Sequence, residues 1–163
     1  IELAEIELRR RNVRMSHYVA ARLPHLLVDP ILIEQVLVNL LRNAAESVEQ
    51  AGRPPGRRSV ELRVVPRQLE TQHVVEFSVV DTGQGLAPEV LERLYEAFFT
   101  TKPEGMGIGL NLCRSIVESH QGRMEAENLY NGPEVVGCRF TFWIPVTGST
   151  NPAVGKDAGV TLA

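Results

Sequence analysis

The feature that most constrains this chain is a long amphipathic helix, predicted to begin after Asp29 and to run to about Gln50. Asp29 can cap the unpaired amides of a helix start, and Pro30 suits the first turn. Apolar residues recur at intervals of three and four, as on a helix with one buried face. They are Ile33, Val36, Leu37, Leu40, Leu41, Ala44 and Val48. Such a face must pack on a second layer of structure.

Two asparagines lie four residues apart on this helix, Asn39 and Asn43. That spacing places both carboxamides on one side, at the edge of the apolar stripe. A single asparagine there is more often a solvated or capping residue, but a pair favours a binding site. Amide oxygens suit Mg²⁺, which keeps several waters and takes few protein ligands. We expect Asn43 to be the metal ligand and Asn39 to orient a water on the ion.

The remaining pattern predicts strands and three further helices. Strands rich in β-branched residues are expected at 13–19, 26–28, 59–65, 74–80, 123–127 and 137–144. Helices are expected at 1–9, 88–94 and 108–120, and residues 52–56 should form a mobile loop. Gly122 is expected to take the glycine position that ends the last helix. This order predicts an α/β (α+β) two-layer sandwich, with a mixed, mainly antiparallel sheet of about five strands and three helices on one face.

A carboxylate follows the strand at 74–80, in the run Asp81-Thr82-Gly83-Gln84-Gly85. Asp and Gly are common in turns, which is the simplest interpretation. The alternative is that Asp81 accepts a hydrogen bond from an exocyclic amine, while Gly83 and Gly85 let the backbone approach a flat ring. Adenine carries an amine where guanine carries a carbonyl, so this pairing predicts selectivity for adenine.

A glycine-rich segment, Gly105-Met106-Gly107-Ile108-Gly109, precedes the last helix. No buried strand comes before it, which excludes a dinucleotide fingerprint, and neither a phosphate loop nor a eukaryotic kinase signature is present. What remains is a flexible lid leading into a helix start, whose free amides favour phosphate. Lys102 either adds charge over a terminal phosphate or is an ordinary surface lysine. Phe98 and Phe99 are expected to anchor the hinge of the lid.

Composition limits the other functions. The chain has 163 residues, 44% hydrophobic and 23% charged, which is typical of one soluble globular domain. A net charge of -3 argues against a nucleic-acid partner. Cys113 and Cys138 lack metal-ligand spacing, so we expect buried free thiols in a reducing compartment. No apolar run is long enough to span a membrane and no signal peptide opens the chain, so we expect a cytoplasmic location.

The chain begins at Ile1 without methionine and in mid-pattern, so we expect a piece of a larger protein. We divide it into the end of an upstream linker or helix at 1–9, one globular domain at 10–146, and a disordered tail at 147–163.

Four segments in this order resemble the ATP-binding catalytic domain of bacterial two-component sensor histidine kinases. They are Asn39–Ala44, Asp81–Gly85, Phe98–Lys102 and Gly105–Leu110. The likeness covers about Arg10 to Pro145. It implies the Bergerat-type ATP-binding fold, shared with gyrase, mismatch-repair ATPases and heat-shock chaperones.

By this resemblance Asn43 coordinates magnesium, Asp81 binds the adenine amino group, and a lid over residues 95–106 closes on the phosphates of ATP. The implied catalytic residues are Asn39, Asn43 and Lys102. The implied nucleotide contacts are Asn39, Asn43, Glu46, Asp81, Gly83, Gly85, Leu86, Thr101, Lys102, Gly105, Met106, Gly107, Ile108, Gly109 and Leu110.

The resemblance also bears on the reaction. Gyrase-like relatives carry a glutamate that activates water where Asn39 stands. An amide cannot take that proton, so hydrolysis should be poor and the γ-phosphoryl group kept for a histidine. His17 is followed by Tyr18 and no helical hairpin is present, so the acceptor is expected on a separate dimerisation domain of the same parent. A downstream response regulator is the further partner, and the fragment itself should be monomeric. A degenerate nucleotide-sensing module and a hydrolytic ATPase stay open as alternatives.

Two positions depart from the common pattern. Glu46 stands where many members carry a basic residue, which is typical of the nitrogen-regulation and oxygen-sensing branch and leaves Lys102 as the basic phosphate contact. Cys138 stands where relatives often have a hydroxyl lining the adenine pocket, so a water-mediated contact should be weaker.

Overall fold

The computed structural model describes residues 2–93 and 108–146. Its elements are α1 (Glu2–Arg10), β1 (Arg14–Val19), α2 (Pro30–Gln50), the short 3-10 helix η1 (Pro55–Arg57), β2 (Ser59–Leu69), β3 (Gln72–Asp81), α3 (Pro88–Arg93), α4 (Ile108–Ser119), β4 (Arg123–Asn131) and β5 (Glu134–Pro145). None of the described helices is long and apolar enough to cross a membrane.

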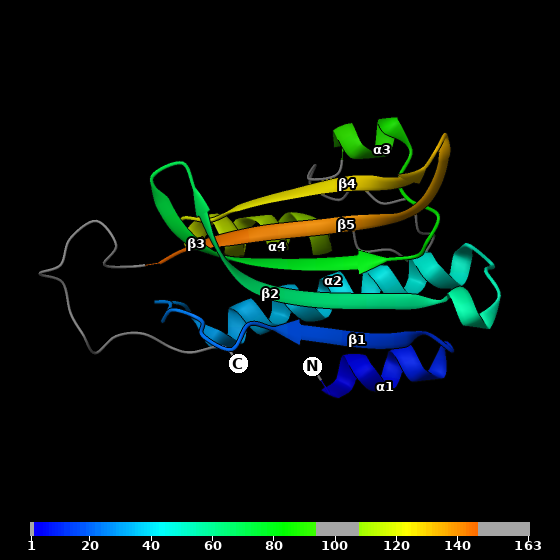
Figure 1. Ribbon diagram of the computed structural model, residues 1–163, viewed down its shortest axis with the longest axis horizontal. Coiled ribbons are helices and arrows are strands. Elements are labelled where there is room, and N and C mark those ends of the chain that lie inside the picture. The colour runs from blue at the N-terminus through cyan, green and yellow to red at the C-terminus, as the bar shows by residue number, and fades with distance from the viewer. Residues whose placement is uncertain (1, 94–107, 147–163) are drawn as a thin grey trace, which may run out of the picture.

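The five strands form one sheet in the order β1-β2-β3-β5-β4 (Figure 1). Strands β1 and β2 are parallel because α2 crosses over between them, whereas the other neighbours are antiparallel. Strand β3 is therefore central, with β2 on one side and β5 on the other. The mixed, mainly antiparallel sheet expected from the sequence is confirmed.

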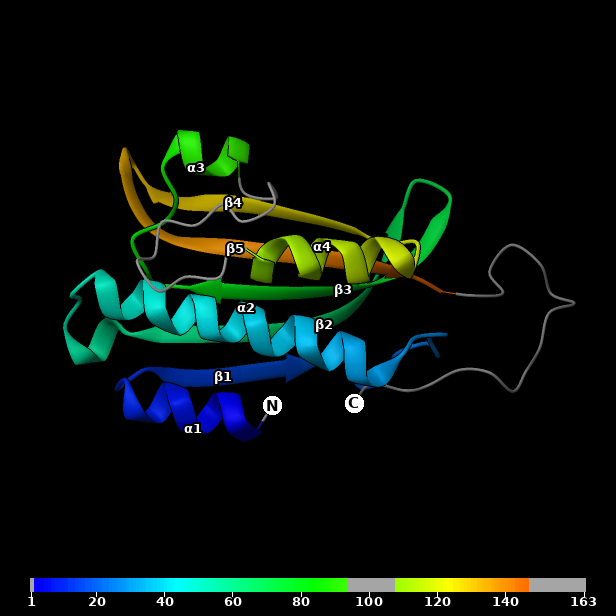
Figure 2. The same cartoon turned by 180° about the vertical axis from the view of Figure 1, so that it is seen from behind.

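Helices α2 and α4 lie side by side across one face of the sheet (Figure 2). Every apolar residue of the predicted α2 stripe is buried. Beneath them, the rings of Phe77 and Phe142 stack with centroids 4.6 Å apart. Helix α1 extends this layer at the β1 edge, where Ala4 and Leu8 are buried. The two-layer arrangement follows from one apolar helix face meeting one apolar sheet face.

One end of this helical layer, where α2 begins and α4 ends, is fixed by specific hydrogen bonds. Asp29 caps α2, accepting from the amides of Ile31 at 3.0 Å and Leu32 at 3.3 Å. The Asp29 amide in turn donates to His120 Nε2 at 3.0 Å, and His120 Nδ1 lies 2.8 Å from the carbonyl oxygen of Ile116. A neutral imidazole protonated at Nδ1 satisfies both bonds. His120 thus joins the start of α2 to the end of α4, which agrees with its expected place at the helix end.

The structure corrects some predicted boundaries. Residues 26–28 do not form a strand: only Leu26 makes an isolated bridge, because Pro24 and the start of α2 leave too short an extended segment. Strands β2, β3, β4 and β5 extend beyond their predicted ends. The predicted tail at 147–163 lies outside the described residues.

The end of α4 also differs from the prediction. The left-handed residue is Gln121, with φ 62°, and not Gly122. The amide of Gly122 bonds to the carbonyl of Val117 at 2.9 Å, and that of Gln121 to Glu118 at 3.0 Å, which is a Schellman motif. Glycine is needed at 122 for space, because a Cβ there would lie 2.1 Å from the carbonyl oxygen of Trp143.

We therefore expect Gly122→Ala to lower the free energy of unfolding by about 1–3 kcal/mol, since the added methyl group has no room. Gln121→Gly is the matched control and should leave stability unchanged or raise it by up to about 1 kcal/mol, because it relieves a left-handed residue. Urea denaturation measures both. Wild-type stability in Gly122→Ala would contradict the packing described here.

Candidate functional site

Helix α2 presents Asn39, Asn43 and Glu46 along one side, and all three side chains are half-buried. Asn39 Nδ2 donates to Cys113 Sγ at 3.7 Å. Cys113 lies on α4, so this contact links the two helices of the layer. Asn39 therefore borders the seam between α2 and α4, and Asn43 lies one turn further along α2.

Asp81 is the last residue of β3, at the centre of the sheet, and only 3% of its surface is exposed. Its Oδ1 accepts a hydrogen bond from the Gly83 amide at 2.8 Å. Burial raises the pKa of Asp81 to about 6, while the backbone amides of Gly83 and Cys138 lower it. The carboxylate is ionised at neutral pH, with amides and no cation among the groups that perturb it. A buried charge of this kind suits a ligand that brings its own donor.

The glycines beside Asp81 are needed for close packing. A Cβ at Gly83 would lie 2.1 Å from Ser47 Oγ on α2 and 2.8 Å from Asp81 Oδ1. Gly85 has φ 73°, and a Cβ there would lie 2.4 Å from Val135 Cγ1. A Cβ at Gly137 would lie 2.0 Å from the carbonyl oxygen of Asp81. In the structure, the turn at Gly83 and Gly85 packs closely against α2, β4 and β5.

Two side chains that the sequence did not single out hold the turn after Asp81. Arg53 Nε donates to the carbonyl oxygen of Thr82 at 2.6 Å, and Nη2 donates to that of Gly83 at 3.2 Å. At the far end, Asn128 accepts from the Leu86 amide at 2.8 Å and donates to the Leu86 carbonyl at 2.6 Å. Asparagine is disfavoured in strands, so Asn128 within β4 was a usable signal. Arg53 gave no signal, because it lies in a segment expected to be a mobile loop.

The two cysteines are free and buried, as expected. Cys138 pairs with Asp81 across β3 and β5. Burial, and secondly the charge of Asp81, raise the pKa of the Cys138 thiol to about 12. Burial raises the pKa of Cys113 to about 11. Both are neutral thiols at physiological pH and not nucleophiles.

The described part of the chain contains only some of the predicted site. Asn39, Asn43, Glu46, Asp81, Gly83, Gly85, Leu86, Gly109 and Leu110 are described, and Ile108 opens α4. The predicted lid at 95–106 lies outside the described residues, together with Phe98, Phe99, Thr101, Lys102, Gly105, Met106 and Gly107.

The donor set on α2 fits magnesium. Asn43 offers an amide oxygen and Glu46, three residues later on the same side, offers a carboxylate. Within residues 2–93 and 108–146, no group of three or more His, Cys, Asp or Glu side chains could hold a metal ion. Magnesium does not need such a group when it is bound through one or two protein oxygens, with waters and phosphates completing its shell.

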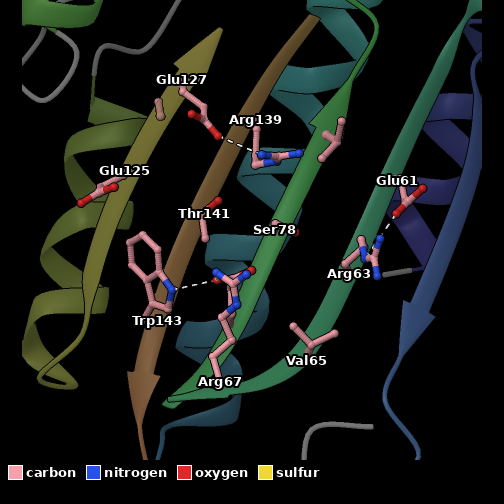
Figure 3. A pocket seen from close by; sticks show the side chains of 13 residues that line it. Glu61, Arg63, Val65, Arg67, Ser78, Glu125, Glu127, Arg139, Thr141 and Trp143 are labelled. Carbon is pink, nitrogen blue, oxygen red and sulfur yellow. Dashed lines mark hydrogen bonds and ion pairs between the residues drawn. The ribbon is translucent and has the colours of Figure 1, made fainter. Parts of the chain in front are cut away.

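A hollow of about 610 Å³ lies on the other face of the sheet, away from α2 and α4 (Figure 3). Its charged side chains pair with one another: Arg67 with Glu76 at 2.9 Å, and Arg139 with Glu127 at 2.9 Å. Trp143 Nε1 also donates to Glu76 at 2.9 Å. These pairs neutralise each other on an outward-facing sheet surface, where each contributes little energy. We interpret this hollow as the solvated face of the sheet.

Comparison with known proteins is consistent with this geometry. A profile of the Histidine kinase-, DNA gyrase B-, and HSP90-like ATPase family matches residues 28–148. The Sensor protein FixL of Bradyrhizobium diazoefficiens is 40% identical over 137 residues, which make up 84% of this chain and 25% of FixL. The chain thus spans about a quarter of that relative.

Solved structures agree. The catalytic domain of histidine kinase ThkA matches with a TM-score of 0.68 and 31% identity, over 89% of this chain and 86% of that domain. Full-length ShkA in complex with AMPPNP matches with a TM-score of 0.70 and 27% identity, over 88% of this chain and 28% of ShkA. The resemblance and fold inferred from the sequence are confirmed. The chain belongs to the histidine kinase-, DNA gyrase B- and HSP90-like ATPase family, and its fold is that of a histidine kinase catalytic domain.

Proposed function

We propose that this domain binds Mg-ATP and, within a longer protein, transfers the γ-phosphoryl group to a histidine on a separate dimerisation domain in two-component signalling. The observation that carries the proposal is the buried, amide-bonded carboxylate of Asp81 at the end of the central strand, in a domain of this family. The related ShkA structure is a complex with AMPPNP, an ATP analogue, which supports a nucleotide ligand.

Asp81 supplies the selectivity for adenine. Its ionised carboxylate accepts the hydrogen bond of the exocyclic amine, and guanine presents a second acceptor at that place. A buried carboxylate facing a carbonyl oxygen leaves two acceptors unpaired, which is costly in a water-poor site. Burial therefore strengthens discrimination as well as binding.

Asn43, with Glu46 one turn further along α2, holds the metal on the phosphate side. Magnesium held by these residues would neutralise charge on the phosphates of ATP. A cation bound beside Glu46 would offset the repulsion between this carboxylate and nearby phosphates. Lys102, Thr101 and Gly105 of the predicted lid, with the glycines at 107 and 109, complete the proposal as phosphate contacts.

Asn39 favours phosphoryl transfer over hydrolysis. Its carboxamide is half-buried and donates to Cys113 Sγ, so it is held at the seam between α2 and α4. An amide can orient a water on the metal but cannot take its proton. The γ-phosphoryl group is then kept for the acceptor histidine and afterwards for a response regulator. This proposal places the domain in the cytoplasm.

Phosphoryl transfer is tested by mixing the chain with the helical hairpin domain of its parent, Mg²⁺ and γ-labelled ATP. We expect acid-labile label on a histidine of the hairpin, and little phosphate release by the chain alone. Binding of ATP without any label would indicate a nucleotide-sensing module instead. Sustained phosphate release would indicate a hydrolytic ATPase.

Asn43→Ala should weaken ATP binding in the presence of Mg²⁺ by about tenfold or more, because a metal ligand is lost. In excess EDTA the variant and wild type should bind ATP equally. Asn43→Asp keeps an oxygen ligand and should retain the response to metal, and Gln35→Ala, exposed on the same helix, is the neutral control. Calorimetric titration measures all four proteins. A magnesium response of wild-type size in Asn43→Ala would exclude Asn43 as the ligand.

The affinity for ATP should fall as the pH drops through about 6, because the raised pKa of Asp81 leaves the carboxyl protonated below that value. If only the ionised form accepts the adenine amine, affinity at pH 5 is about tenfold lower than at pH 7. Asp81→Asn cannot titrate at this position, so any pH dependence that it retains belongs to the nucleotide or to other groups of the protein. Binding measured from pH 5 to 8 tests this, and identical pH profiles for the two proteins would rule out the assigned role.

A further inference from the structure

Arg53 lies in the connection between α2 and β2 and joins three separate segments. Its guanidinium donates to the carbonyl oxygens of Thr82 at 2.6 Å, Gly83 at 3.2 Å and Val135 at 3.3 Å. The first two belong to the turn after Asp81, and the third to the start of β5. A guanidinium presents several donors in a rigid plane, so one half-buried side chain can bond both to the turn after Asp81 and to the start of β5.

Arg53 is itself held in place. Arg58 Nε donates to the Arg53 carbonyl oxygen at 2.7 Å, so the backbone that carries the guanidinium is fixed. The neighbouring Thr82 side chain is also engaged: its Oγ1 accepts from the Ser59 amide at 3.0 Å and donates to the Arg57 carbonyl at 2.7 Å. The contact between Arg53 and the turn is therefore part of a connected hydrogen-bond network.

The link to Asp81 runs through a single peptide unit. The carbonyl of Thr82, which accepts from Arg53 Nε, and the amide of Gly83, which donates to Asp81 Oδ1 at 2.8 Å, belong to the same peptide plane. Peptide groups are planar, so fixing the direction of the carbonyl also fixes the direction of the amide. A donor on the carbonyl also polarises the peptide and strengthens the bond that its amide makes.

We propose that Arg53 is a positioning residue for adenine recognition: by holding the Thr82–Gly83 peptide, it sets the direction in which the Asp81 carboxylate meets the base. This inference rests on the proposed role of Asp81 in binding adenine. Arg53 donates to backbone oxygens of the turn and acts on the nucleotide only through it. Asn128 holds the other end of the same turn through Leu86, so Arg53 orients a loop that is already anchored on one side.

The test compares Arg53→Ala with wild type in the binding of ATP and GTP with Mg²⁺, from pH 5 to 8. We expect ATP affinity to fall about tenfold and the preference for ATP over GTP to fall with it, since a loosened peptide weakens one hydrogen bond to a charged acceptor. The hydrogen bond from the Gly83 amide lowers the pKa of Asp81. Weakening that bond should therefore raise the pH at which ATP affinity is half-maximal. A purely structural role would lower the melting temperature without moving that pH.

Arg57→Ala is the matched control, because it removes an exposed arginine from the same connection. It should behave as wild type. Arg53→Lys keeps the positive charge but cannot donate several hydrogen bonds in one plane. We therefore expect a nucleotide preference between those of wild type and Arg53→Ala. If Arg53→Ala fails to fold, Arg53→Lys decides by the same two readouts.

An unchanged nucleotide preference and an unchanged pH of half-maximal affinity in the folded variant would overturn the inference about Arg53. Those results leave the role of Asp81 intact. Failure of the wild type to bind ATP, or wild-type nucleotide preference in Asp81→Asn, would instead overturn the proposed function, so the two failures are distinguishable.

Discussion

The carboxylate of Asp81, buried at the end of β3, is the group on which the arrangement of this domain depends. Burying an ionised carboxylate is costly unless hydrogen bonds replace the lost water. Here the backbone amides of Gly83 and Cys138 supply those hydrogen bonds. The pKa of Asp81 nevertheless stays raised, because burial has the larger effect. The turn can reach the carboxylate because position 83 carries no side chain, and β5 can pack against the backbone of Asp81 because position 137 carries none. These glycines would suggest a flexible segment from the sequence, but in the structure they allow close packing around Asp81.

The helical layer carries the residues proposed to bind the metal and the phosphates. Helix α2 is fixed at its start by the Asp29 cap and by His120, which belongs to the end of α4. Near its middle, Asn39 contacts Cys113 on α4. The two helices that border the proposed nucleotide site therefore contact each other at two places along their length. A shift of α4 would displace residues of α2.

Local sequence patterns predicted much of this structure. The 21-residue helix α2, its Asp29 cap and its buried stripe follow from periodicity and capping chemistry, which act over neighbouring residues. Asp81 at a strand end and the asparagine pair were also accessible from the sequence. What failed depended on distant contacts: Gly122 is glycine because β5 approaches it, and Gln121 takes the left-handed position instead. The partners of Arg53 and Asn128 could not be assigned, because they lie 29 to 82 and 42 residues away along the chain. The lid residues, including Lys102, lie outside the described part of the chain and stay predictions.

The most direct test of this account is the ionisation of Asp81 itself. Carbon-13 NMR of the side-chain carboxyls, with Asp81→Asn to assign the signal, follows its titration with and without ADP and Mg²⁺. The account predicts a pKa of about 6 in the nucleotide-free domain, and a clear fall when the adenine amine binds the ionised form. A pKa near 4 in the free domain, or a titration that nucleotide leaves unchanged, would contradict it.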